Sequence, residues 1–185
     1  MGKGHAQTGF TLTELVITTS LMAILFAITI PPLISIREQT QAEQHINQLH
    51  RMLSYARYIA ITQTSRITLC PLDGNQKCGS DWHQKLTLFQ DVNNNRSLDP
   101  GESAFSSVRP VYSDQEYRSF NNSVISFDSH GFSGIHTGSL SYCYTGTNKT
   151  GGVLIISRNG RIRQGRDSNH DGLPETPNGN NIPCS

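Results

Sequence analysis

One long apolar segment near the start of the chain limits how the protein can fold. Residues 15–36 carry no charged side chain, and the first charge after them is Arg37. A helix needs about 20 mostly apolar residues to cross the hydrocarbon core of a bilayer. A secretory signal peptide would place a cleavage site with small residues directly after such a segment, and none follows Ile36. We therefore expect the segment to stay in the mature protein as a membrane-spanning helix.

The residues before this segment indicate its orientation and include one unusual charge. The leader, residues 1–9, carries Lys3 and no acidic residue, which favours a cytoplasmic N-terminus. Glu14 stands at the head of the apolar helix, where an unpaired carboxylate is costly in lipid. It could lie among solvated headgroups at the interface, or it could pair with a charge from another molecule.

The segment Gly9-Phe10-Thr11-Leu12-Thr13-Glu14-Leu15 resembles the processing site of type IV prepilins and type II secretion pseudopilins. In those proteins a short basic leader ends in Gly, Phe usually starts the mature chain, and a Glu follows four residues later. Pro31 falls where they commonly carry a helix-kinking proline. The resemblance implies that a prepilin peptidase cuts after Gly9 and methylates the new amine of Phe10. It also implies that Glu14 pairs with the N-terminal amine of a neighbouring subunit in a filament, since a buried charge requires a partner.

A second helical stretch follows the Pro31-Pro32 pair. These prolines should bend or locally melt the helix, because each lacks an N–H and crowds the preceding turn. Beyond them, an apolar stripe predicts an amphipathic helix that ends at about Thr64 and packs on a sheet. The stripe comprises Ile46, Leu49, Leu53, Ala56 and Ala60. We expect a leader over residues 1–9, a transmembrane and filament-core helix over 10–38, and one soluble domain over 39–185.

Short β-like runs separated by Gly, Asn, Pro and Asp follow residue 63. One long helix followed by such runs predicts the α+β class, with a helical spine packed against antiparallel sheets. No internal repeat and no second hydrophobic core are visible in the sequence. The predicted strands are Arg66–Cys70, Lys85–Gln90, Ser103–Tyr112, Ser123–Phe127, Ser139–Tyr144, Gly152–Ser157 and Arg161–Gln164.

The order of these elements resembles the FimT/GspH family of minor pilins and pseudopilins. The helix ends in Ser54-Tyr55-Ala56-Arg57-Tyr58-Ile59-Ala60-Ile61 and is followed by Ile67-Thr68-Leu69-Cys70. Trp82, Phe89-Gln90-Asp91 with its Asn-rich turn, and Gly160-Arg161-Ile162-Arg163 come next in the same order. The resemblance covers most of the chain. It implies a globular domain of two β-sheets with the helix packed on one of them.

Four cysteines form an even set without metal-ligand spacing, which in an exported chain favours two disulfides over zinc. Cys70 and Cys78 flank a natural turn and would close a small local loop. Cys143 would then pair with Cys184 and attach the C-terminal tail to a strand. The alternative is that one or both pairs stay reduced.

Two Asn- and Asp-rich segments resemble calcium-binding loops. In residues 91–102 oxygen-bearing side chains stand at the ligand positions, but Arg96 occupies the place where the sharp turn needs Gly. In residues 167–178 Gly172 is correctly placed, but Asn178 stands where a bidentate Glu is needed. Both segments could equally be polar turns, since Asn and Asp cap their own backbone. The candidate ligands are Asp91, Asn93, Asn95, Asp99, Glu102, Asp167, Asn169 and Asp171.

No acidic residue occurs from Ser129 to Arg166, although the whole chain is nearly neutral. Loss of the leader removes one of the 15 basic residues and leaves 14, against 14 acidic ones. Within the acid-free stretch, Arg161 and Arg163 alternate and would share one face of a strand. Guanidinium groups placed in this way can fork onto successive phosphates. The candidate DNA-binding residues are Lys149, Arg158, Gly160, Arg161, Arg163 and Arg166.

Few aromatic residues accompany this basic cluster, so we expect electrostatic, sequence-independent and salt-sensitive binding of duplex DNA. In the FimT-like branch of the family, a C-terminal Gly-Arg-x-Arg element is associated with DNA binding during natural transformation. Gly160, Arg161 and Arg163 match that element. The alternative is an ordinary solvated basic hairpin, with or without pairing to Asp167, Asp171 and Glu175. The secretion branch can carry a similar turn, so the motif does not separate the branches.

These patterns together predict a minor type IV pilin. It would wait in the inner membrane with a cytoplasmic N-terminus and a periplasmic domain, and then join other pilin subunits in an extracellular pilus. The alternatives are a minor pseudopilin of a type II secretion system and a purely structural pilin without a ligand. We predict neither an enzyme nor a cofactor, because the catalytic fingerprints G-x-S-x-G, HExxH and the P-loop are lacking and the 7 His are scattered.

Overall fold

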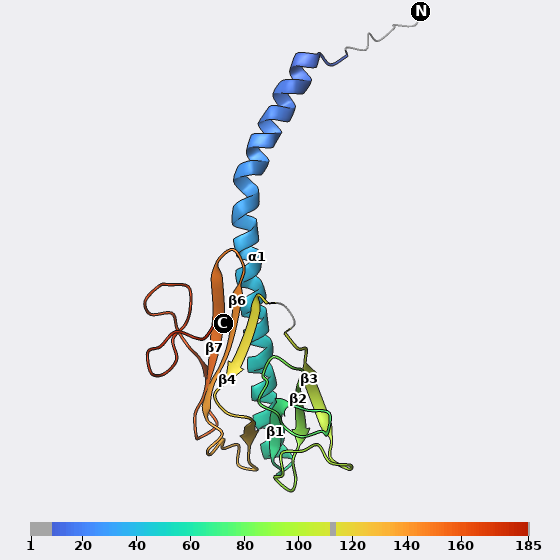
Figure 1. The fold of residues 1–185 in the computed structure, drawn as a ribbon, viewed down its shortest axis with the longest axis vertical. Coiled ribbons are helices and arrows are strands. Elements are labelled where there is room, and N and C mark those ends of the chain that lie inside the picture. Colours follow the sequence, from blue (N-terminus) through green and yellow to red (C-terminus); the bar gives the residue numbers. More distant parts are fainter. Residues whose placement is uncertain (1–8, 112–113, 185) are drawn as a thin grey trace, which may run out of the picture. The chain divides into compact units, whose positions relative to one another are not determined.

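The computed structural model describes residues 9–111 and 114–184, apart from the side chains of residues 29–32. The chain divides into two compact units, Met1–Arg37 and Glu38–Ser185. One helix, α1 (Leu12–Thr62), runs from the first unit into the second, and all strands of the described residues lie in the second unit (Figure 1). The class is therefore α+β, which confirms the prediction.

Helix α1 starts with a reciprocal hydrogen-bonded cap. The hydroxyl of Thr11 accepts from the N–H of Glu14 (3.3 Å), and the Glu14 carboxylate accepts from the N–H of Thr11 (2.9 Å). This arrangement is a capping box, which satisfies two N–H groups that have no partner within the helix. Thr11 and Glu14, which fix the start of the helix at Leu12, thus belong to the predicted processing motif.

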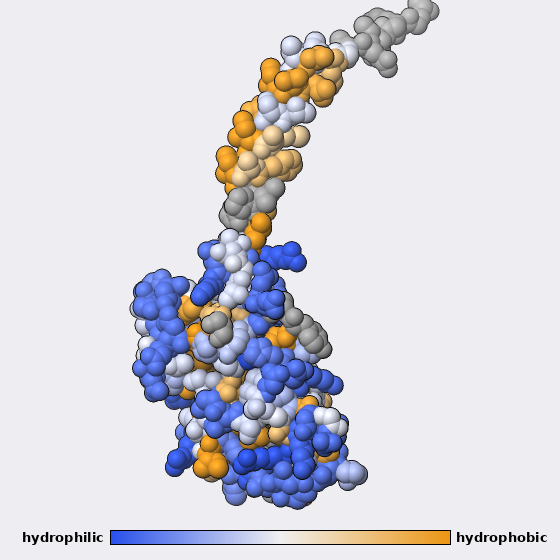
Figure 2. Space-filling view, in the orientation of Figure 1, coloured by the Kyte–Doolittle hydropathy of each residue, from blue (hydrophilic) through white to orange (hydrophobic). Residues whose placement is uncertain are grey.

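The first unit is an apolar helix whose described side chains are exposed, apart from the half-buried Ser35. Its apolar window is long enough to cross a membrane, and no part of that window is buried within the chain. Figure 2 shows apolar side chains, coloured orange, over much of this part of the helix. The helix is uninterrupted at Pro31 and Pro32, so the local melting expected there is not observed. The side chain of Pro31 lies outside the described residues, and its role in a filament stays a prediction.

The second unit contains two four-stranded sheets with antiparallel pairing throughout. The strand order is β3-β2-β1-β5 in one sheet and β4-β6-β7-β8 in the other. The strands are β1 (Ile67–Pro71), β2 (Leu86–Gln90), β3 (Ala104–Val108), β4 (Glu116–Phe120), β5 (Ile125–Phe127), β6 (Gly138–Thr145), β7 (Lys149–Ile156) and β8 (Ile162–Gln164).

The second half of α1 packs against the sheet that contains β6 and β7. Ile46 fills the space that Gly152 of β7 leaves open, where a Cβ would come within 2.4 Å of the Ile46 side chain. His45 stacks on Tyr142 of β6 with ring centroids 4.1 Å apart. All five residues of the predicted apolar stripe are buried, and residues of both sheets join them in one main core. Burial of this stripe is what holds the helix to the globular unit.

Two strands differ from the predictions. β3 ends at Val108 and does not continue towards Tyr112, and β4 was not predicted at all. The inward positions of β4 are Glu116, Arg118 and Phe120, and all three are buried. Buried positions therefore alternate along β4, as is typical of a strand, but charged side chains occupy two of the three buried positions, where apolar residues are expected.

Both predicted disulfides are present. Cys70 and Cys78 close a short loop after β1, and Cys143 of β6 is joined to Cys184 near the C-terminus. The second bridge holds the C-terminal tail against a small apolar cluster that includes Val153, Leu173 and Ile182. No free cysteine occurs in the described residues.

Candidate functional site

The Gly-Arg-x-Arg motif begins in the tight turn between β7 and β8. The N–H of Gly160 donates to the carbonyl of Ser157 (2.8 Å), and the N–H of Ser157 donates to the carbonyl of Arg161 (3.0 Å). Gly160 has φ +74°, a conformation that other residues rarely adopt. A Cβ at this position would also lie 1.8 Å from the carbonyl oxygen of Gly131. The turn therefore requires glycine for two independent reasons.

The loop of residues 128–136 lies directly against this turn. The carbonyl oxygen of Arg158 accepts hydrogen bonds from the N–H groups of Ser133 and Gly134, both at 3.1 Å. The loop also closes on itself, because the carboxylate of Asp128 accepts from the N–H of Phe132 (2.9 Å) and the N–H of Asp128 donates to the Phe132 carbonyl (2.9 Å). The side chains of this loop are thus held beside the basic turn.

Arg57 of α1 connects the helix to both segments. Its Nε donates to the carbonyl of Gly131 (3.1 Å) and its Nη2 to the carbonyl of Asn159 (3.4 Å). One guanidinium group therefore fixes the loop and the turn against the helix end. Arg57 lies in the helix-end segment that the family resemblance singled out, but its linking role was not predicted.

The basic candidates are exposed and unpaired. Within the described residues, none of their side chains forms an ion pair or a hydrogen bond, whereas His83–Asp81 and Arg109–Glu116 do pair. The exposed set is Lys149, Arg158, Arg161, Arg163 and Arg166. Their charge is available to an anionic partner.

The acidic residues after β8 do not neutralise the arginines. The carboxylate of Asp167 accepts from the N–H groups of His170 (2.7 Å) and Gly172 (2.9 Å). The carboxylate of Glu175 accepts from the N–H of Ser168 at 2.9 Å. These carboxylates satisfy the backbone of their own loop. Among the described residues the internal ion pairs are therefore absent, but exposed arginines are equally those of an ordinary solvated basic hairpin, and that alternative to a DNA-binding site stays open.

The register of β8 determines which basic residues lie together. Arg163 pairs with Ile155, whose side chain belongs to the apolar cluster on the sheet face opposite α1. Opposite residues of an antiparallel pair share a face, so Arg163 lies on that outer face. Lys149 starts β7 at the other end, roughly 25 Å of strand away from the turn. Lys149 is thus separate from the arginines of the turn.

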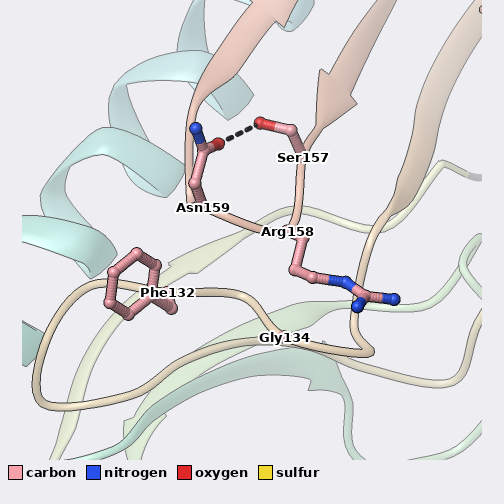
Figure 3. A pocket seen from close by; sticks show the side chains of 5 residues that line it. All are labelled: Phe132, Gly134, Ser157, Arg158 and Asn159. Atoms are coloured by element: carbon pink, nitrogen blue, oxygen red, sulfur yellow. Dashed lines mark hydrogen bonds between the residues drawn. The ribbon is translucent and has the colours of Figure 1, made fainter.

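A cavity of about 600 Å³ lies between the loop and the turn. It is lined by Phe132, Gly134, Ser157, Arg158 and Asn159. Figure 3 shows the Phe132 ring and the Arg158 guanidinium on opposite sides, with Ser157 donating to the Asn159 side chain (2.7 Å). The Phe132 side chain is 50% exposed. The sequence prediction of a basic cluster with few aromatics missed this ring, because only the fold brings it beside the turn.

The first calcium candidate forms a self-contained turn. The side-chain amides of Asn93 and Asn95 donate to one oxygen of Asp99 at 2.8 and 2.7 Å, and Glu102 accepts from the N–H of Val92. Asp91 is fully buried and accepts instead from the Thr68 hydroxyl in β1 (3.0 Å). Arg96, at the position that needs Gly, has φ +60°.

The second calcium candidate is similar. Asn169 and Asn181 donate side-chain N–H groups to Asp171, which also accepts from the N–H of Leu173. Within the described residues, no group of three His, Cys, Asp or Glu side chains is arranged to hold a metal ion. The turn interpretation accounts for these contacts, and calcium binding stays an untested prediction.

A buried polar network connects the two sheets and was not predicted. Arg118 of β4 is fully buried and donates to the carbonyls of Trp82 (2.6 Å), Gln84 (2.6 Å) and Arg109 (3.2 Å). Burial lowers the pKa of Arg118 to about 10, so the guanidinium stays charged. Burial next to Arg118 lowers the pKa of His45 to about 4, so the imidazole is neutral near pH 7. The only feature of the sequence that could have indicated β4 and this network is the placement of Glu116, Arg118 and Phe120 at alternate positions.

The sequence from residue 45 to residue 160 matches the family model described as type II transport protein GspH. The chain belongs to the GspH family. The matched region ends at Gly160, so membership of the GspH family by itself says nothing about Arg161, Arg163 and Arg166, which lie beyond it.

The fold of this GspH-family chain is similar to that of the type IV minor pilin FimU from Pseudomonas aeruginosa (strain PAO1). A crystal structure of FimU in space group P21 aligns with a TM-score of 0.52 at 20% identity, over 69% of this chain and 90% of that chain. A second crystal form, P65, gives a TM-score of 0.49 at 21% identity, over 66% and 90%. No protein with a curated description matches the sequence significantly. The similarity to FimU shows a pilin-like fold, and membership of the GspH family supports the prediction that the chain is not an enzyme.

The N-terminal candidates of this GspH-family chain lie before and at the first helical turn. Gly9 and Phe10 are exposed, and Phe10 is 87% exposed. Glu14 accepts from both the N–H and the hydroxyl of Thr11. In the single chain the Glu14 carboxylate therefore caps its own helix, and pairing with the amine of another subunit stays a prediction.

Proposed function

We propose that this chain is a minor type IV pilin that binds duplex DNA through the arginines of the β7–β8 hairpin. The observation that supports the proposal most directly is that Arg158, Arg161 and Arg163 are exposed and have no acidic partner among the described residues. An unpaired row of guanidinium groups at the edge of a sheet is suited to the phosphate backbone of DNA.

The spacing of these residues fits a charged backbone. Arg161 and Arg163 are two residues apart at the start of β8, which corresponds to roughly 7 Å along an extended strand. Guanidinium groups at this spacing can each contact a different phosphate of one strand. Contacts of this type carry no sequence information, so binding should be independent of sequence and sensitive to salt.

The cellular setting follows from the resemblance to the FimT-like branch and from the apolar helix. The precursor would be anchored in the inner membrane, cut after Gly9 by a prepilin peptidase and methylated at Phe10. The mature subunit would then enter an extracellular pilus with other pilin subunits and hold DNA for uptake in natural transformation. Glu14 and Pro31 would serve in filament assembly.

One observation favours a second function. The family model that matches residues 45–160 is described as a type II transport protein. A minor pseudopilin of a type II secretion system would have the same anchor and fold, but it would not bind DNA.

A DNA titration tests the first function. Full-length protein in detergent is titrated with blunt duplex DNA at two salt concentrations, alongside Arg161→Gln/Arg163→Gln. The control is Arg37→Gln/Lys85→Gln, which removes the same charge from exposed positions outside the hairpin; Arg37 adjoins Glu38, which contacts Thr147 at the other end of β7. We expect the hairpin variant to bind more weakly and to lose about two units of salt dependence, because two phosphate contacts are removed. Equal binding by both double variants, or no binding at low salt, would refute DNA binding at this site.

A further inference from the structure

Two cavities adjoin along the 128–136 loop. The first, of about 600 Å³, lies between Phe132 and Arg158. The second, of about 260 Å³, is lined by Arg66, Arg96 and His136, among others. Phe132 and Gly134 line both cavities, so the two adjoin at this loop segment, and together they are called the groove below.

The aromatic ring in this groove is both exposed and held in place. Phe132 is 50% exposed, and its ring stacks with that of His130, with centroids 6.4 Å apart. The N–H and the carbonyl of Phe132 are both bonded to Asp128. The loop in turn is attached to the basic turn through the carbonyl of Arg158. The backbone that carries the ring is thus fixed, which reduces the entropy lost when a flat partner stacks on the ring.

The second cavity supplies positive charge. Within the described residues, neither Arg66 nor Arg96 forms an ion pair, and Arg66 donates only to the hydroxyl of Ser126 (3.3 Å). Asp128 also lines this cavity, but one of its carboxylate oxygens accepts from the N–H groups of His130 and Phe132, both at 2.9 Å. With the Asp128 carboxylate counted, two guanidinium groups still leave this lining with a net positive charge, so the groove combines an aromatic platform with a site that favours a phosphate.

We propose that this groove binds a segment of single-stranded DNA, with one base stacked on Phe132 and a neighbouring phosphate held between Arg66 and Arg96. Sites for single strands combine an aromatic platform with a positively charged track, and the base must be free of its partner strand. The inference rests on the proposed DNA-binding function and adds that unpaired ends of DNA are held more tightly than the duplex body.

The bases of an intact duplex cannot reach the ring, because they are stacked and paired inside the helix. The Arg161 and Arg163 contacts would hold the duplex backbone, whereas the groove would take an overhang or a frayed end. The arginine contacts should therefore bind a blunt duplex, whereas the groove should bind only DNA that has an unpaired end. An experiment that compares the two forms of DNA can distinguish the two sites.

The experiment compares full-length protein in detergent bound to a blunt duplex and to the same duplex with a short single-stranded overhang. We expect the overhang to tighten binding by about tenfold, since stacking of one base on an aromatic side chain has about this effect. Phe132→Ala should abolish this gain and leave the affinity for blunt duplex unchanged. Phe132→Tyr should retain it, and Arg96→Gln should reduce it. Val92→Ala, an exposed apolar position outside the two linings, is the matched control.

A fluorescent adenine analogue in the overhang provides a second readout on the unaltered protein. Its emission should change on binding when it lies in the overhang and not when it lies within the duplex. No gain from the overhang, an equal loss for both DNA forms in Phe132→Ala, or no fluorescence change would each overturn the inference. If blunt duplex still binds through Arg161 and Arg163, the proposed function stands without it; if no DNA binds at all, both are refuted.

Discussion

The Cα of Gly160 lies so close to the carbonyl oxygen of Gly131 that a Cβ at residue 160 would be 1.8 Å from it. This contact joins the β7–β8 turn, with its arginines, to the loop that carries Phe132. The Gly of the Gly-Arg-x-Arg motif therefore has a structural role: it allows two segments that are distant in sequence to form one surface.

Gly160→Ala should destabilise the second unit and weaken DNA binding. The substitution combines a left-handed backbone conformation with a steric clash, and such strain costs on the order of 1–3 kcal/mol. Thermal unfolding and DNA titration measure the two effects. Gly74→Ala is the control, because a Cβ at Gly74 would meet nothing within 4 Å. Equal unfolding temperatures for the two variants would contradict this account of the motif.

Arg57→Ala should release the 128–136 loop without unfolding the helix. The guanidinium of Arg57 donates to carbonyls of both the loop and the turn, and hydrogen bonds from a charged group contribute about 1.5–3 kcal/mol. Amide hydrogen exchange should accelerate in residues 128–136 and 157–161 and stay unchanged in β1 and β2. Arg51→Ala, on an exposed position of the same helix, should change neither region. Uniform exchange rates in all three proteins would show that Arg57 does not hold the loop.

Arg118→Met should be the most damaging of the single substitutions considered. Removal of the guanidinium leaves the carbonyls of Trp82, Gln84 and Arg109 without their donor inside the fold. A buried acceptor left without its donor costs about 1–3 kcal/mol, and three carbonyls lose theirs at once. Denaturant titration should show this loss, whereas Arg166→Met, at an exposed position, should shift the unfolding free energy by no more than about 0.5 kcal/mol. Comparable stability of the two variants would rule out a structural role for the network.

The stability of the second unit should fall as the pH decreases from about 6.5 towards 4. Burial beside Arg118 lowers the folded-state pKa of His45 to about 4, below the ordinary value of 6.5. In this window the unfolded chain binds a proton that the folded chain does not, so the unfolding free energy decreases by up to about 1.4 kcal/mol per pH unit. Glu116, whose pKa is lowered chiefly by the hydrogen bond from Arg109, adds a further loss at lower pH.

His45→Gln should reduce the pH dependence between 6.5 and 4, because one titrating group is gone; burial also lowers the pKa of His136, which leaves part of the slope. Unfolding curves at several pH values test this directly. A slope in this window that is as steep in the variant as in the unaltered protein would mean that another group is responsible.

The elements that follow simple periodicity could be predicted from the sequence. The buried stripe from Ile46 to Ala60 repeats at helical steps, and seven of the eight strands were located approximately. β4 was missed because Glu116 and Arg118 stand at its inward positions, where the pattern rule expects apolar residues. Those charges are tolerated only because carbonyls from distant segments meet Arg118, and such partners are invisible to a local pattern.

The features of the candidate site also fall into those that the local sequence predicts and those that only the fold determines. The anchor segment, the processing motif, the cysteine pairs and the arginine row are local in sequence, since each depends on residue types at short spacing or on composition. The separation of Lys149 from the arginines, the link through Arg57 and the position of Phe132 beside the turn depend on strand register and on contacts between distant segments. Hydrophobic burial and hydrogen bonding across the sheets bring these segments together, so the surface that they form exists only in the folded chain.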